Sequence, residues 1–119
     1  MALGDTYVWC PPGTVINHLW IVISNPASKD NGVVVINLTD SSHGPFSFTL
    51  KPGQHPYLYK DSDVNFGDAF FTSLSEITLA VTCGSAKPHQ PMGMTIVLEI
   101  IKKAKTHPAF TPSLRKYLP

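Results

Sequence analysis

The chain has 119 residues with a formal net charge of +1, a length that fits one domain, 1–119, with a single core. Hydrophobic residues make up 43% and charged residues 14%, and 11 prolines and 8 glycines divide the chain into short segments, which favours a mainly β fold over a helical bundle. The charge alone indicates no class of partner, and no apolar stretch approaches the ~18 residues of a membrane span, so no membrane partner is expected.

The first three predicted strands precede residue 41. Residues 6–10 form a strand that ends at Pro11, and the apolar runs 19–23 and 33–36 are β-branched and too short for helices. The connection 25–32 is rich in turn formers, so the second and third strands are expected to pair as an antiparallel hairpin. This pairing would place His18 and Thr39 near the same end of the hairpin.

The middle of the chain is less regular. Residues 46–50 alternate apolar and polar side chains, which predicts a half-buried strand with Phe46, Phe48 and Leu50 facing inward. Residues 51–68 show little periodicity and many hydrogen-bonding groups, which is typical of a functional loop. Closing strands are predicted at 70–71 and 77–83, followed by a connection over 84–93.

The C-terminal segment, about 94–119, is predicted to be a helical tail. Met94, Val97, Leu98 and Ile101 recur at the spacing of one helix face, so a helix over 94–105 should pack on the sheet. Thr111 followed by proline predicts a short last helix over 111–118. The same end carries five of the nine basic residues (Lys102, Lys103, Lys105, Arg115 and Lys116), which either meet phosphates or form a solvated face.

Cys10 and Cys83 have no neighbouring Cys or His at metal-ligand spacing, and the N-terminal residues lack the features of a signal peptide. We therefore expect a cytoplasmic protein with reduced thiols, no metal site and no cofactor.

Three short segments carry a family resemblance. His18 opens an apolar strand that ends in Ile-Ser-Asn-Pro, a second strand ends in Leu-Thr, and Ser62-Asp-Val-Asn-Phe66 follows later. Over roughly residues 4–80 this order resembles the MazF/PemK/Kid group of toxin-like endoribonucleases. The resemblance implies an SH3-like small barrel with a C-terminal α-helix, a homodimer, a cognate antitoxin protein as partner, and single-stranded RNA as substrate.

The expected chemistry is metal-independent cleavage of RNA by attack of the ribose 2′-OH on the adjacent phosphate. This reaction needs a base, an acid and donors to the phosphate, and the two histidines His18 and His55 suit proton transfer near neutral pH. Asp68 is a third catalytic candidate, as a general acid if burial raised its pKa. The predicted substrate-binding residues are Thr39, Ser62, Lys60 and Tyr57.

Four of these residues also have a structural alternative. His18 at a strand end can bond a backbone carbonyl, His55 can be an exposed turn residue, Thr39 can bond its own turn, and Gly67-Asp68 is an ordinary turn pair. Phe66 stands where the family has an arginine, and Arg115 is the only arginine in the chain. Because this removes the guanidinium clamp on phosphate, the alternative function is a non-catalytic module on the same barrel that binds protein or nucleic acid.

Overall fold

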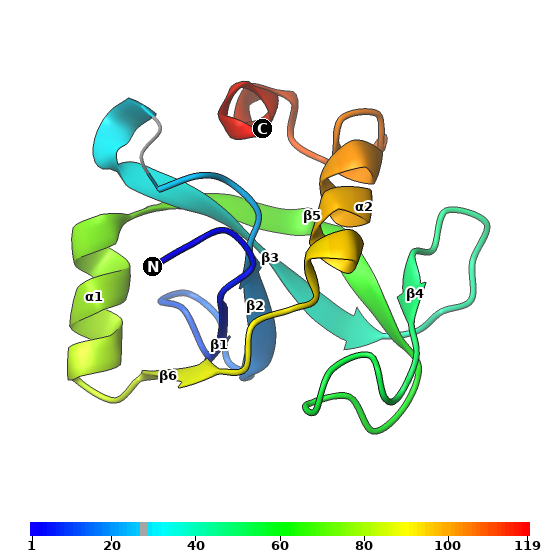
Figure 1. The fold of residues 1–119 in the computed structure, drawn as a ribbon, viewed down its shortest axis with the longest axis horizontal. Helices are drawn as coiled ribbons and strands as arrows, with labels where there is room; N and C mark the ends of the chain where they lie inside the picture. Colours follow the sequence, from blue (N-terminus) through cyan, green and yellow to red (C-terminus); the bar gives the residue numbers. More distant parts are fainter. Residues whose placement is uncertain (27–28) are drawn as a thin grey trace.

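The computed structural model describes residues 1–26 and 29–119. Six strands form one antiparallel sheet in the order β4-β5-β3-β2-β1-β6, curled into a half-barrel (Figure 1). The strands are β1 (Thr6–Trp9), β2 (His18–Val22), β3 (Gly32–Asp40), β4 (Thr49–Leu50), β5 (Ser62–Ser73) and β6 (Ala86–His89). The expectation of a mainly β fold is therefore confirmed.

The two strands of the hairpin predicted between residues 18 and 40 pair as expected, and residues 27–28 of its connection lie outside the described residues. β2 and β3 pair antiparallel with Trp20 opposite Asn37 and Val22 opposite Val35. Their β-branched side chains alternate between two buried faces, so both strands are apolar at nearly every position. This register brings the start of β2 and the end of β3 to the same end of the sheet.

The two faces of the sheet are covered by different helices. On one face Leu19, Ile21 and Ile36 pack with α2 (Met94–Ala104), Phe110 and Leu114. On the other face Trp9, Trp20 and Val35 pack around Ile77 of α1 (Leu74–Thr82). Figure 1 shows α1 and α2 on opposite sides of β1, β2 and β3.

The strand predicted over 77–83 is wrong, because residues 74–82 form helix α1. Ser73 caps this helix by accepting a hydrogen bond from the Glu76 amide at 3.2 Å, and Leu74, Ile77 and Val81 follow at helical spacing. The predicted connection over 84–93 contains β6, which pairs with β1 from Trp9–Ala86 to Thr6–His89.

The predicted strand over 46–50 is reduced to β4, and Phe46 is 63% exposed rather than inward. Residues 62–68 of the predicted 51–68 loop belong to β5, which runs to Ser73. Residues 66–69 of β5 lie opposite Ile36 alone, since Asn37 pairs with Asn65 and Val35 with Phe70. This bulge explains why Gly67 and Asp68 look like a turn in the sequence.

Helix α2 is confirmed, but its buried stripe is rotated from the predicted one. Val97, Ile100, Ile101 and Ala104 are buried, whereas Met94 and Leu98 are 47% and 52% exposed. The last helix is a 3₁₀ helix, η2 (Pro112–Tyr117), and a second one, η1 (Lys29–Asn31), precedes β3. Within the described residues, no helix is long and apolar enough to cross a membrane.

Candidate functional site

A groove of about 370 Å³ opens where β2 begins and β3 ends. We call it the His18 groove. Its walls come from the start of β2, the end of β3 and the segment before β5, and the lining residues are Ile16, Asn17, His18, Leu38, Thr39, Asp40, Tyr57, Leu58, Tyr59, Lys60 and Ser62. Five of the seven predicted site residues are in this set: His18, Thr39, Tyr57, Lys60 and Ser62.

His18 is half-buried at the first position of β2, and its Nδ1 lies 3.0 Å from the backbone oxygen of Leu38. Because a carbonyl can only accept, Nδ1 must carry the proton of this hydrogen bond. In the neutral ring, Nε2 is then the basic nitrogen. The interpretation as a strand-end histidine bonded to a carbonyl is correct in geometry, and it leaves Nε2 available for proton transfer or for a ligand hydrogen bond.

Thr39 and Ser62 lie at the end of the β3–β5 ladder, where Thr39 pairs with Asp63 and Asp40 pairs with Ser62. Thr39 is half-buried and lines the His18 groove. The Ser62 hydroxyl donates to the backbone oxygen of Lys60 at 3.3 Å, so it also fixes the chain that carries Lys60.

Lys60 supplies the cation of the groove. Its Nζ lies 2.8 Å from Asp40 Oδ1 and 5.3 Å from the centre of the Tyr59 ring. The hydrogen bond to Asp40, followed by that to Tyr59, raises the pKa of Lys60, so the ammonium stays charged at neutral pH. Asp40 partly neutralises this charge, and both side chains are open to solvent, 46% for Lys60 and 78% for Asp40.

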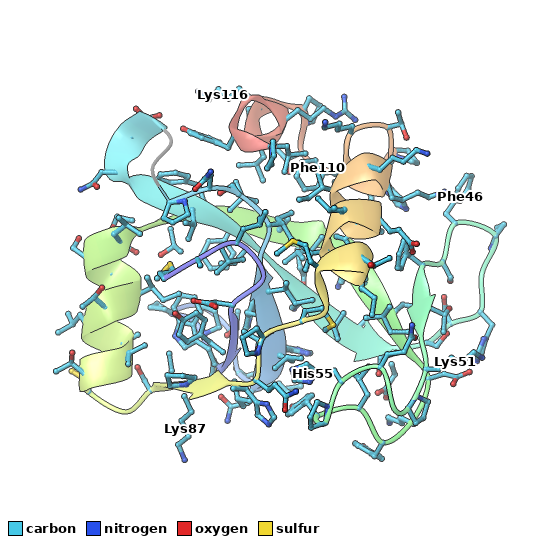
Figure 2. The ribbon with its side chains drawn as sticks, in the orientation of Figure 1. Phe46, Lys51, His55, Lys87, Phe110 and Lys116 are labelled. Atoms are coloured by element: carbon cyan, nitrogen blue, oxygen red, sulfur yellow. The ribbon has the colours of Figure 1, made fainter. Side chains whose placement is uncertain are left out.

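His55 lies outside the groove, between the loop after β4 and the segment after β6 (Figure 2). It is 2% exposed, its Nε2 donates to the Gln90 backbone oxygen, and its Nδ1 accepts from the Tyr57 amide at 3.1 Å. The His89 ring is 5.0 Å away. His55 is therefore neither an exposed turn residue nor in reach of a ligand in the groove, but it holds the backbone of Tyr57, which lines the groove.

Asp68 also lies apart from the His18 groove, in the bulge of β5. It is exposed, and its Oδ2 accepts from Asn37 Nδ2 at 3.3 Å. The burial on which its role as general acid depended is therefore absent.

Asp63, which the sequence did not single out, is the most heavily hydrogen-bonded side chain beside the site. It is 7% exposed, and one oxygen accepts from the Ser41 and Thr49 hydroxyls, each at 2.7 Å. The other oxygen accepts from the Ser42 amide at 2.9 Å and from the Ser47 hydroxyl at 3.0 Å. Burial raises the pKa of Asp63, but these bonds outweigh it and lower the pKa from 3.8 to about 2.

In the part of the chain that the structure describes, no three His, Cys, Asp or Glu side chains gather in a way that could hold a metal ion. The polar groups that line the His18 groove are an imidazole, hydroxyls, an ammonium, phenols, the Asn17 amide and the Asp40 carboxylate.

Comparison with protein-family models, curated proteins and solved structures finds no match for this chain. The resemblance to the MazF/PemK/Kid group thus rests on the short segments around residues 18, 39 and 62.

Proposed function

We propose that this chain is a small-barrel protein, similar to the MazF/PemK/Kid group, that binds single-stranded RNA in the His18 groove. The observation that carries the proposal is the meeting of His18, Thr39 and Lys60 in one groove. Hydroxyl and ammonium groups are donors to phosphate, the free Nε2 of His18 can accept from a ribose hydroxyl, and Tyr57 and Tyr59 offer rings on which bases can stack.

The Lys60–Asp40 pair makes the proposal sharply testable. Lys60→Gln removes the cation, so we expect weaker binding of a fluorescent single-stranded RNA and a slope of log K against log salt that is smaller by ~0.7. Asp40→Asn should do the opposite and tighten binding, because it removes the negative charge that competes with phosphate. Fluorescence anisotropy over a salt series measures both effects.

Exposed lysines elsewhere serve as matched controls. Lys87→Gln on β6 and Lys103→Gln on α2 remove the same charge outside the groove. If Lys103→Gln weakens binding as much as Lys60→Gln does, the RNA binds at the basic C-terminal end instead. If neither Lys60→Gln nor Asp40→Asn changes the affinity, the groove does not bind RNA.

Cleavage of the bound RNA is the second candidate function, favoured by the bond that fixes His18 Nδ1 to Leu38 and directs Nε2 to act as base. His55 is not placed to be the acid, so the proton for the leaving 5′-oxygen would come from Lys60 or Tyr57. Cleavage by this route should resist EDTA, leave a 2′,3′-cyclic phosphate, and fall ~10²- to 10⁴-fold in His18→Ala. Binding without any cleavage would leave the non-catalytic module.

The resemblance also carries the proposals of a homodimer and of an antitoxin partner. Light scattering on the purified chain tests the first, and a monomer at micromolar concentration would end it. Capture of a protein encoded beside this chain, competing with RNA for the groove, tests the second.

A further inference from the structure

A second hollow, of about 420 Å³, adjoins the His18 groove. We call it the Phe46 hollow. It shares Thr39 and Asp40 with the groove, so the two lie on either side of the end of β3. Its other walls include Phe46 and Ser47 of the loop before β4, Asn65 and Phe66 of β5, and His107 of the segment after α2.

Phe46 is exposed on a loop that is held in place. The ring is 63% exposed and projects from the loop before β4 (Figure 2). The buried Asp63 carboxylate binds this loop through Ser42 and Ser47 on either side of Phe46, and His107 Nε2 donates to the Phe46 backbone oxygen at 3.3 Å. These hydrogen bonds fix the backbone of the loop that carries the Phe46 ring. The loop therefore presents a large apolar ring to solvent in a preorganised position, as contact with a ligand requires.

The interior of the hollow is aromatic with a few polar groups. The His107 and Phe66 rings stack at 4.3 Å with an interplanar angle of 15°, and the Phe46 ring stands at 76° to His107 with centroids 6.3 Å apart. The Asn65 amide, which can both donate and accept, and the Ser42 and Ser47 hydroxyls line the same space. Phe66 and His107 are buried, so the flat aromatic surface open to a ligand is the exposed Phe46 ring, which beside an amide suits a planar ligand with a hydrogen-bonding edge.

We propose that the Phe46 hollow is a nucleobase subsite, in which a base stacks on Phe46 and presents its edge to Asn65. The inference rests on the proposed function, because the nucleotide is the one next to the phosphate held by Thr39 in the His18 groove. Phosphate contacts in the groove fix the position of the strand, and the hollow is where its base identity can be read.

The first experiment removes the ring. Phe46→Ala should weaken binding of a short single-stranded RNA roughly 5- to 100-fold, the effect of losing one aromatic stacking partner. Phe46→Tyr should keep most of the affinity, because it keeps the ring, whereas Phe46→Leu should not. Leu79→Ala on α1 is the matched control, since Leu79 is also 63% exposed but lies on the face away from α2. Thermal unfolding of each variant verifies that the fold is kept.

The second experiment removes the base. A series of RNAs, each with one abasic position, is measured against the wild-type chain and against Phe46→Ala. One position should weaken wild-type binding by about the same factor as Phe46→Ala, and the two losses should not add when combined, because both remove the same stack.

The outcomes separate this inference from the proposed function. If Lys60→Gln weakens RNA binding but Phe46→Ala and Phe46→Leu leave it at the wild-type level, the groove binds RNA and the base subsite is wrong. Fully additive losses at every abasic position also overturn the subsite. If the wild-type chain binds no RNA, both proposals fall.

Discussion

Asp63 is a buried carboxylate whose two oxygens bond only neutral donors in the described part of the chain. Its depressed pKa means that the folded state favours the charged form. By linkage this contributes ~2 kcal/mol to stability above the unfolded pKa of 3.8, and the contribution is lost as the pH falls through the folded pKa of about 2.

We therefore predict that Asp63→Asn lowers the free energy of unfolding at pH 7 by ~2 kcal/mol or more, because the amide turns a donor toward hydroxyls and an N–H. The loss should shrink between pH 4 and pH 2, where the wild-type chain itself loses the carboxylate contribution. Urea unfolding over this pH range measures both. Asp68→Asn, in the same strand but exposed, is the control and should change stability by less than ~0.5 kcal/mol.

His55 is a second buried residue whose hydrogen bonds are expected to stabilise the fold. His55→Ala leaves the Gln90 carbonyl and the Tyr57 amide without their ring partner and opens a cavity, so it should cost ~2 kcal/mol or more of unfolding free energy. His55→Gln, which can keep the donor to Gln90, should cost less. Unfolding in urea is the measurement. An alanine variant of unchanged stability that no longer cleaves RNA would instead return His55 to the role of acid or base.

Among the elements, the strands around the hairpin could be predicted because their signals are local: continuous β-branched runs bounded by turn residues at 25–32. Helix α1 could not, since Ile77 to Val81 has strand-like composition and its cap depends on Ser73 and Glu76, which the β-rich context obscured. β5 was masked by its polar residues, among them Asp63, whose partners come from the distant loop before β4.

The candidate site likewise has one part that local sequence pattern predicts and other parts that depend on long-range packing. The hairpin register places His18 beside Thr39, so local pattern was enough for that part. The placement of His55 against Gln90 depends on how β6 pairs with β1, a contact 35 residues away along the chain. The Phe46 hollow needs the segment around His107, which lies 61 residues from Phe46. Long-range packing of this kind leaves no sequence pattern.

Helix α2 allows a matched test of which face is buried. Ile101→Asp places a charge at a position only 4% exposed, so it should cost more than ~3 kcal/mol or prevent folding. Leu98→Asp makes the same change at a position 52% exposed on the same helix and should stay within ~1 kcal/mol. Thermal unfolding of the two variants compares them. Equal losses would show that the buried stripe is placed wrongly.

For the molecule as a whole, the sheet separates two apolar clusters, and the prediction of one domain over 1–119 requires that they unfold together. Ile36→Ala truncates the cluster under α2, whereas Trp9 and Trp20 report on the cluster under α1. We expect a loss of ~2–5 kcal/mol and an equal shift of the urea midpoint by tryptophan fluorescence and by far-UV circular dichroism. A fluorescence transition that does not move would mean two independent units.

The edges of the sheet decide how this protein can associate. β4 and β6 are the first and last strands in the order of the sheet. β4 has only two residues, and β6 (Ala86-Lys-Pro-His89) carries one lysine and one proline. The proline has no backbone N–H to donate to another strand. Short strands, charge and proline are the features by which edge strands resist pairing with another chain. Strand addition is thus disfavoured along β4 and β6, and we expect a second copy or a partner protein that approaches these two strands to bind through side chains rather than through the backbone. The same features should limit edge-to-edge aggregation along these two strands at high concentration.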